Sequence, residues 1–241
     1  MEKMNKNDET FLLRNAIEHT LLKPDIVIDE IEKLCKEAAE FGFGAICIPT
    51  YFLDDAKELL TETKIQIATV IGFPFGYNSI MSKFEEAEDA LSRGADHLDI
   101  VLNIAAIKNA DYDMVNNEME MFTKLVHSEN KIIKCIAETG LLNEIEIDLV
   151  CKLANDYGID FLKTSTGINA PGADLETVRM MRKVLDKKIK IKASGGIRTK
   201  AQAIAFLVAG ADRIGTSSGV AIMEEVNGEK INPTDNIDLR R

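Results

Sequence analysis

Two lysines lie where an amine could bond covalently to a carbonyl substrate. Lys163 lies in Phe-Leu-Lys-Thr-Ser-Thr-Gly and Lys192 in Ile-Lys-Ala-Ser-Gly-Gly, and each ends a short apolar run typical of a buried strand. Burial disfavours an ammonium ion, and two nearby lysines lower each other's pKa because like charges repel. We therefore expect a neutral amine able to form a Schiff base. The alternative is that both side chains extend from the strand ends into solvent.

A carboxylate lies in another apolar run. Asp99 falls within residues 97–102, and a buried carboxylate costs several kcal/mol unless it is paired or hydrogen-bonded. Lys163 and Lys192 are natural partners if all three side chains face one functional site. A purely structural ion pair is the alternative. Asp96 lies in the loop before this strand, and we expect it to be solvated.

Small residues follow the strands that carry the lysines and the strand after them. Glycine lets backbone N–H groups approach an anion, and hydroxyl groups add donors. Loops of this kind often bind a phosphate group, although each cluster could equally be a simple turn. The residues expected to bind the substrate, mainly through its phosphate, are Thr166, Gly167, Gly195, Gly196, Ser217 and Ser218. Thr20 and Cys47, at the ends of the first two expected strands, are possible further substrate contacts.

The cysteines have no spacing typical of a metal site. Cys35, Cys47, Cys135 and Cys151 include no Cys-x-x-Cys pair and no histidine at zinc-ligand spacing. We expect them to be small core side chains in a reducing compartment, with Cys47 close enough to a strand end to be an exposed thiol near the site. The sequence therefore predicts no metal site and no cofactor.

The three histidines are too scattered to form a catalytic triad. We expect His19 to lie near the site, where it could touch substrate. His97 is expected to be structural and His127 to lie on the surface.

Eight short strand-like runs alternate with amphipathic helical stretches and must position these groups. The expected strands are residues 16–20, 45–48, 67–71, 97–101, 132–137, 160–163, 189–193 and 213–215. Such alternation predicts a parallel sheet with right-handed crossovers, and eight units in 241 residues favour an α/β fold, a single-domain (β/α)8 TIM barrel over residues 1–241. The site then lies at the C-terminal ends of the strands. Residues from about 227 to 241 are polar and expected to form a loose tail.

The net charge and the distribution of apolar residues indicate which classes of binding partner the protein has. A formal net charge of -11 argues against binding to a nucleic-acid backbone. Residues 1–10 are polar without an apolar signal-peptide core, and no apolar run approaches the ~18 residues that span a bilayer. We expect a cytoplasmic protein with a small sugar-phosphate substrate, no nucleic-acid or membrane partner, and a homodimeric or homotetrameric assembly.

Taken together, these segments resemble the deoxyribose-phosphate aldolase family, whose members are class I aldolases. The resemblance runs from about His19 to Ser218, and the two lysine segments together are its most specific part. The matching segments are His19-Thr-Leu-Leu-Lys-Pro24, Ala-Ile-Cys-Ile-Pro49, Val-Ile-Gly-Phe-Pro74, Gly94-Ala-Asp-His-Leu-Asp99, Phe-Leu-Lys163-Thr-Ser-Thr-Gly, Lys192-Ala-Ser-Gly-Gly-Ile-Arg198 and Arg213-Ile-Gly-Thr-Ser-Ser218.

The resemblance implies roles for three residues. Lys163 would form the Schiff base, Lys192 would be the second catalytic lysine, and Asp99 would belong to the proton relay. The implied reaction is the reversible, metal-independent cleavage of 2-deoxy-D-ribose 5-phosphate to D-glyceraldehyde 3-phosphate and acetaldehyde. Two alternatives remain: a Schiff-base aldolase acting on a ketose phosphate, and a phosphate-binding barrel without chemistry.

The chain departs from the family pattern at two places. Glu18 stands before His-Thr, where the family usually has aspartate, so the side chain there is one methylene longer. Some members end in a tyrosine that reaches the site, whereas this sequence ends in Asp-Leu-Arg-Arg. We expect proton transfer here not to depend on such a tyrosine.

Overall fold

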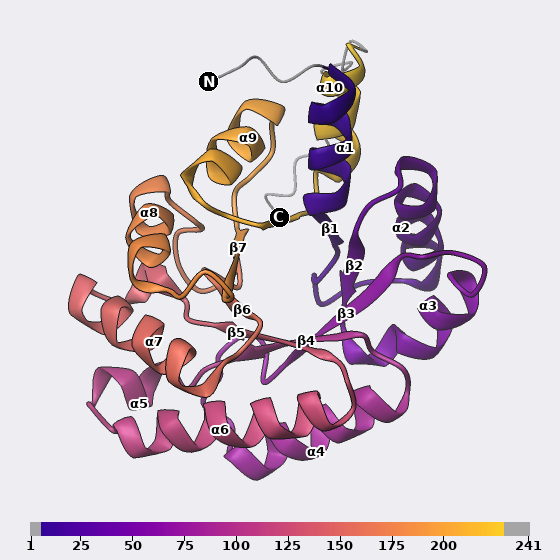
Figure 1. The fold of residues 1–241 in the computed structure, drawn as a ribbon. Coiled ribbons are helices and arrows are strands. Elements are labelled where there is room, and N and C mark those ends of the chain that lie inside the picture. The colour runs from indigo at the N-terminus through magenta and orange to yellow at the C-terminus, as the bar shows by residue number, and fades with distance from the viewer. Residues whose placement is uncertain (1–5, 229–241) are drawn as a thin grey trace.

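The computed structural model describes residues 6–228, and its centre is a closed barrel of eight strands (Figure 1). Neighbouring strands are parallel and follow the order of the sequence, and β8 pairs with β1 to close the ring. The strands are β1 (Ile17–Thr20), β2 (Ala45–Ile48), β3 (Gln66–Ile71), β4 (His97–Val101), β5 (Ile132–Ile136), β6 (Phe161–Lys163), β7 (Lys190–Ser194) and β8 (Arg213–Thr216). The predicted (β/α)8 barrel is confirmed, with each strand boundary within one residue of its expected place.

Helices connect the strands and surround the barrel (Figure 1). The α-helices are α1 (Lys6–Ala16), α2 (Ile28–Phe41), α3 (Leu53–Leu59), α4 (Ile80–Ser92), α5 (Ile104–Lys108), α6 (Tyr112–Ser128), α7 (Glu144–Tyr157), α8 (Leu175–Val184), α9 (Lys200–Ala209) and α10 (Gly219–Asn227). Two short 3-10 turns are η1 (Thr50–Phe52) and η2 (Thr139–Leu141). Because α10 extends to Asn227, the predicted tail would begin after it, and residues 229–241 lie outside the described residues.

Local sequence signals set the helix boundaries. The Asn143 side chain accepts from the Glu146 N–H at 3.0 Å, and the Glu146 carboxylate accepts from the Asn143 N–H at 2.8 Å, which fixes the start of α7. At the other end, Gly158 has φ 65°, a left-handed conformation that glycine adopts readily. These ends set where β6 begins and therefore where Lys163 is placed.

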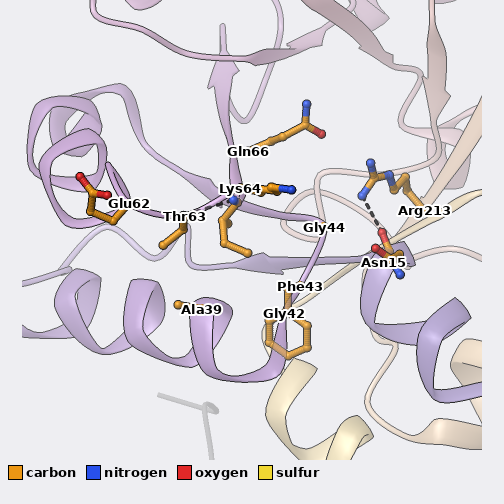
Figure 2. Close-up of a pocket in the computed structure, with 11 residues that line it drawn as sticks. Asn15, Ala39, Gly42, Phe43, Gly44, Glu62, Thr63, Lys64, Gln66 and Arg213 are labelled. Atoms are coloured by element: carbon orange, nitrogen blue, oxygen red, sulfur yellow. Dashed lines mark hydrogen bonds between the residues drawn. The ribbon is translucent and has the colours of Figure 1, made fainter. Parts of the chain in front are cut away.

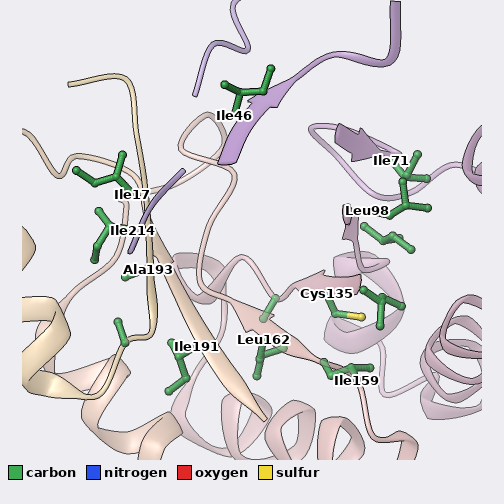
Figure 3. Close-up of a cluster of buried hydrophobic side chains, with 14 of the residues drawn as sticks. Ile17, Ile46, Ile71, Leu98, Cys135, Ile159, Leu162, Ile191, Ala193 and Ile214 are labelled. Atoms are coloured by element: carbon green, nitrogen blue, oxygen red, sulfur yellow. The ribbon is translucent and has the colours of Figure 1, made fainter. Parts of the chain in front are cut away.

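Alternate residues of each strand face opposite sides of the barrel wall. Most outward side chains are apolar and belong to the hydrophobic core, among them Ile46, Leu98, Leu162 and Ile191 (Figure 3). One part of the interior is also apolar, where Cys47, Ala68 and Val70 of β2 and β3 contact Leu22 and Phe73. The rest of the interior holds charged side chains from β1 and β4 to β7, so the barrel wall separates the apolar core from an ionic centre.

Candidate active site

Asp99 lies at the centre of a buried charged cluster. Its Oδ2 atom accepts hydrogen bonds from Lys163 Nζ at 2.8 Å and from Lys192 Nζ at 2.7 Å. Its Oδ1 atom accepts one from Lys134 Nζ at 2.8 Å. The expected juxtaposition of Asp99 with the two lysines is therefore present, and a third lysine, Lys134, joins them from β5.

Glu18 supplies the second carboxylate of this cluster. It forms an ion pair with Lys192 and another with Lys134, whose Nζ atom lies 3.4 Å from Glu18 Oε2. We define the charged cluster as Glu18, Asp99, Lys134, Lys163 and Lys192. Neither Glu18 nor Lys134 was proposed as a site residue from the sequence, yet each lies inside a buried strand and is as costly to leave unpaired as Asp99.

Only one amine of the charged cluster reaches the solvent-accessible surface. Glu18, Asp99, Lys134 and Lys192 are 0 % exposed, whereas the Lys163 side chain is 3 % exposed. Its position at the C-terminal end of β6 places the amine nearest the mouth of the barrel. Of the three clustered lysines, Lys163 is therefore the one that a substrate entering from the mouth would meet first.

The pKa values of the carboxylates follow from their neighbours. Burial acts to raise the pKa of Asp99, but Lys134, Lys163 and Lys192 outweigh it and hold that pKa well below its ordinary value. Burial likewise opposes the ionisation of Glu18, while Lys134 and Lys192 lower its pKa to about 2. Both groups are therefore carboxylates at neutral pH and accept hydrogen bonds only.

The expectation that the paired lysines lower each other's pKa is wrong for Lys192. Burial acts to lower its pKa, but Asp99 and Glu18 together raise it above its ordinary value. Two carboxylates contact this amine directly, and their attraction exceeds the repulsion from the neighbouring lysines. Lys192 is thus held as a cation beside Lys163.

His97 has the structural role that the sequence indicated. It is buried, and its Nδ1 atom lies 2.9 Å from Lys134 Nζ. Burial and the Lys134 charge lower the pKa of His97 to about 2, so the ring is neutral and accepts a hydrogen bond from Lys134. His97 therefore fixes the orientation of the third lysine.

Gly215 on β8 leaves the space that Lys192 occupies. A Cβ atom built on Gly215 would lie 2.3 Å from Ser194 Oγ and 3.0 Å from Lys192 Cε. A larger residue there would displace both side chains. Ser194 was not proposed from the sequence. Its hydroxyl is buried, has no hydrogen-bond partner among residues 6–228, and lies one inward position beyond Lys192 on β7.

Three predictions around β1 and β2 need revision or comment. Cys47 is not an exposed thiol: it is fully buried, its Sγ atom lies 4.0 Å from Asp99 Oδ2, and burial raises its pKa. His19 faces outward, because alternation places Glu18 inside, and its Nε2 atom lies 2.8 Å from Glu37. Thr20 is at the strand end as expected, and its hydroxyl donates to the Glu18 carbonyl at 2.9 Å.

The two remaining predictions on isolated polar residues have mixed outcomes. His127 is exposed, which confirms its predicted place on the surface, and its Nε2 atom lies 3.0 Å from Asp160 Oδ2. Asp96 is only partly solvated, because it accepts from the Ile67 N–H at 3.0 Å and pairs with Lys131 at 2.8 Å.

The glycine-rich loops after β6 and β7 converge at the mouth. Gly167, Gly195 and Gly196 have φ values of 81°, 93° and 77°, which favour glycine. A Cβ atom on Gly195 would lie 2.7 Å from the Gly172 Cα atom and 3.4 Å from the Gly167 Cα atom. A side chain at Gly195 would therefore keep the loop after β7 from approaching the loop after β6 this closely. The predicted binding glycines are thus brought together from separate loops.

The start of α10 forms the adjoining part of this rim. Ser218 is its N-cap residue but makes no side-chain capping bond, and the Ser218 N–H donates to Thr216 Oγ1 at 2.9 Å. Ser217 is exposed and Ser218 half-buried. The two serines and the first turn of α10 thus follow directly on the C-terminal end of β8.

Thr166 differs from the other expected binding residues. Its N–H and its hydroxyl both donate to the buried carboxylate of Glu138, the hydroxyl at 2.5 Å. With both donors occupied, Thr166 has none left to bind an anion directly. Glu138 was placed at the mouth by the sequence but was given no role.

A separate hollow of about 580 Å³ opens at the opposite end of the barrel (Figure 2). It is bounded by residues at the N-terminal ends of strands, including Gln66 and Arg213, and Arg213 Nη1 donates to the Asn15 carbonyl at 2.7 Å. It therefore opens at the end of the barrel opposite to the loops that follow β6 and β7. Among residues 6–228, no three metal-ligating side chains gather and no helix is long and apolar enough to span a membrane.

The comparisons with known proteins agree with this geometry. The family model described as DeoC/LacD family aldolase matches residues 5–225. A deoxyribose-phosphate aldolase of Thermoanaerobacter pseudethanolicus is 47% identical over 91% of this chain and 99% of its own. One from Thermococcus gammatolerans is 49% identical over 86% of this chain and 93% of its own.

Solved structures give the same result. An aldolase called QR15 has a TM-score of 0.85 at 40% identity, covering 90% of this chain and 96% of its own. The deoxyribose phosphate aldolase of Aeropyrum pernix, described as having a unique tetrameric structure, has a TM-score of 0.84 at 30% identity, covering 92% of each chain. With a buried lysine–carboxylate centre at the mouth of its barrel, the chain belongs to the DeoC/LacD family of aldolases and is a lyase.

Proposed function

We propose that this aldolase cleaves 2-deoxy-D-ribose 5-phosphate reversibly to D-glyceraldehyde 3-phosphate and acetaldehyde through a Schiff base on Lys163. The main support for this proposal is that Lys163 and Lys192 both donate to Asp99 Oδ2, while Lys163 is the only lysine of the charged cluster whose side chain is accessible to solvent. Curated relatives named deoxyribose-phosphate aldolase support the substrate. The reaction would serve the breakdown of deoxyribose phosphate.

The balance of charge favours a neutral Lys163. Two carboxylates, Glu18 and Asp99, can balance two ammonium groups, and Lys192 is held as one of them. Three lysines therefore surround two carboxylates, and one amine has no carboxylate of its own. A neutral amine is the nucleophile that attack on an aldehyde requires.

Lys163 would attack C1 of the open-chain sugar, and loss of water would give an iminium ion. A water molecule would take the proton from the C3 hydroxyl and pass it to the relay of Asp99 and the Lys192 cation as the C2–C3 bond breaks. The electron pair of that bond moves into the iminium and gives an enamine, while C3 becomes the aldehyde carbon of glyceraldehyde 3-phosphate. Protonation of the enamine carbon and hydrolysis then release acetaldehyde and restore Lys163.

The phosphate would bind at the rim described above. Backbone N–H groups around Gly167, Gly195 and Gly196, the hydroxyls of Ser217 and Ser218, and the free N-terminus of α10 supply donors without a formal positive charge. Thr166 would shape this rim rather than donate to the anion. The assembly proposed is a homo-oligomer, in line with the tetrameric relative from Aeropyrum pernix.

Trapping with borohydride tests the proposal. Acetaldehyde with borohydride should leave a reduced two-carbon adduct on the peptide that carries Lys163, read by mass spectrometry, and wild type should turn over deoxyribose 5-phosphate while Lys163→Ala should not. The matched control is Lys83→Met, which removes a buried lysine outside the barrel. Adducts on surface lysines alone would contradict the Schiff base, and preferred turnover of a ketose phosphate would contradict the substrate.

A further inference from the structure

We propose that Glu138 is a positioning residue that holds the loop after β6 in the shape needed to bind the phosphate end of the substrate. The inference rests on the proposed function for the identity of that substrate. We define the mouth loop as residues 164–169, which begins directly after Lys163. Its shape fixes Gly167, one of the glycines expected to approach the phosphate.

All hydrogen bonds found for the Glu138 carboxylate come from this loop. The Thr166 N–H lies 3.2 and 3.3 Å from its two oxygens, the Thr166 hydroxyl 2.5 Å from Oε2, and the Asn169 amide nitrogen 3.3 Å from Oε2. Glu138 itself is 0 % exposed. A carboxylate two residues beyond the end of β5 thus organises a loop that leaves the neighbouring strand.

The hydroxyl of Thr166 links Glu138 to the rest of the mouth loop, because it donates one hydrogen bond and accepts others. The Thr166 hydroxyl donates its single proton to Glu138 Oε2. The Thr166 oxygen is then free to accept, and the N–H groups of Ile168 and Asn169 lie 3.1 and 3.4 Å from it. Removal of the carboxylate would therefore break the bonds from Thr166 to Glu138 and would also leave the Thr166 hydroxyl free to turn away from the N–H groups of Ile168 and Asn169.

The carboxyl group of Glu138 has no cationic partner in the part of the chain that the structure describes. Within residues 6–228, no lysine or arginine nitrogen lies within ion-pair distance of this carboxylate, in contrast to buried Glu118, which pairs with Lys83. A buried carboxylate without a cation depends on its hydrogen-bond donors for stability. Any loop conformation that withdraws these donors is strongly disfavoured, so the charge selects one shape for the loop.

The backbone of Glu138 gives an independent indication. Its φ and ψ of 50° and 55° are left-handed, a conformation that non-glycine residues seldom adopt. Such outliers persist where surrounding interactions hold them, and they cluster at functional sites. Here the left-handed turn directs the side chain toward the mouth loop, while the next N–H, of Thr139, donates to the Thr164 carbonyl at 2.8 Å.

The same network extends across the barrel mouth. The Asn169 amide nitrogen donates to the Pro74 carbonyl in the loop after β3 at 2.6 Å as well as to Glu138. Loops after β3, β5 and β6 are thereby linked through Glu138 and Asn169. The Lys163 amine is held separately by Asp99, so loss of Glu138 should affect the phosphate rim more than the reacting amine.

The test compares Glu138→Gln, Glu138→Gly and Thr166→Val with wild type. Glycine suits the left-handed backbone, so Glu138→Gly removes the carboxylate without adding strain. Asp96→Asn is the control, because Asp96 also accepts from a backbone N–H but lies at the opposite end of the barrel. Each variant is assayed for hydrogen–deuterium exchange of the 164–169 peptide without substrate, and for kcat and KM on deoxyribose 5-phosphate and on unphosphorylated deoxyribose.

Glu138→Gly should accelerate exchange in the mouth loop by at least about tenfold, the loss expected for a charge-assisted hydrogen bond. Its KM for deoxyribose 5-phosphate should rise about tenfold while kcat and the KM for deoxyribose change less than about threefold. Glu138→Gln and Thr166→Val should fall between, and Asp96→Asn should leave loop exchange unchanged.

Unchanged loop exchange in Glu138→Gly would overturn the positioning role, as would a fall in kcat with KM unchanged, which would make Glu138 an acid–base group. Equal increases in KM on both sugars would show that the mouth loop does not act on the phosphate, and this result would also overturn the positioning role. The exchange measurement uses no substrate. Failure of Lys163 trapping in wild type would therefore count against the proposed reaction while leaving the loop assignment intact.

Discussion

Two buried clusters of lysine and carboxylate differ in how their charges are matched. Outside the barrel, Lys83 of α4 pairs with Glu118 of α6 and also donates to the carbonyls of Gly76 and Val101 at 2.8 and 3.0 Å. Inside the barrel, three lysines share two carboxylates. Both clusters are buried, so burial alone does not distinguish a reactive lysine from a structural one.

The pKa directions make the difference clear. Burial raises the pKa of Glu118 in spite of Lys83, whereas the three lysines around Asp99 reverse the effect of burial and lower its pKa. The outer pair is matched one to one and satisfied further by backbone groups. The inner cluster has one amine beyond the number of carboxylates.

Lys192→Met removes the cation next to Lys163 and should have the largest effect. We expect kcat to fall by about 10⁴-fold, the upper end for a group that takes part in proton transfer. Circular dichroism should show the barrel still folded, and the pH profile of the remaining activity should shift because Lys163 has lost a cationic neighbour. Near-normal activity with an unchanged pH profile would remove Lys192 from the mechanism.

Lys83→Met should destabilise the protein without impairing the chemistry. Removal of one partner of a buried ion pair costs about 3–5 kcal/mol in the free energy of unfolding, measured by urea denaturation. Acetaldehyde trapping on Lys163 should continue at temperatures where the variant is folded. The double change of Lys83→Met with Glu118→Leu should recover part of the lost stability, because it no longer leaves a buried carboxylate unpaired. Loss of trapping in the folded single variant would show that the two clusters are not independent.

Asp99→Asn keeps the shape of the side chain but removes its charge and basicity. We expect turnover to fall by about 10²–10³-fold, within the range of general acid–base groups. The comparison to make is between kcat and the urea midpoint. If the variant lost stability to heat or urea but kept its turnover, Asp99 would be a structural residue like Glu118.

The pH dependence of stability should show the smallest effect. The pKa values of Glu18, Asp99 and His97 are all lower in the folded protein than their ordinary values of 4.5, 3.8 and 6.5. Below about pH 6.5 the unfolded chain therefore binds more protons than the folded one, first at histidine, and stability is lost as pH falls. Each group contributes a slope of at most about 1.4 kcal/mol per pH unit.

Urea denaturation between pH 7 and pH 5 measures this slope. In that interval His97 accounts for most of the contribution of Glu18, Asp99 and His97. His97→Gln should flatten the curve in that interval. A slope that persists in His97→Gln would assign the effect to groups outside the barrel. The raised pKa of Lys192 works in the opposite sense, so its contribution is lost only as pH rises above 10.5.

The sequence predicted the barrel well because its strands carry strong local signals. Each apolar run appears as a strand, and the lysine that ends β6 and the aspartate within β4 lie where strand alternation directs them. The same reasoning applied to residues 132–136 would have found Lys134, whose neighbours on both sides are apolar. Alternation would also have placed Glu18 inside and His19 outside.

Other features depended on contacts between distant segments. The raised pKa of Lys192 reflects two carboxylates from β1 and β4, far from it in the chain, and attention to the lysine pair alone predicted the opposite sign. The occupation of both Thr166 donors requires the left-handed turn at Glu138, which no glycine or asparagine signals in the sequence. Local pattern therefore predicts which strand a residue lies on but not which loops it binds.

The charged cluster also divides the barrel into two half-barrels of opposite sign. Both carboxylates come from the first four strands, on β1 and β4, and all three lysines come from the next three, on β5, β6 and β7. Neither half-barrel alone could bury its own charges, since each would gather only like charges, whereas docking of the two neutralises both sets. Two fragments divided near residue 103 should therefore associate as complements, and an assembly of two identical halves should be disfavoured by electrostatic repulsion.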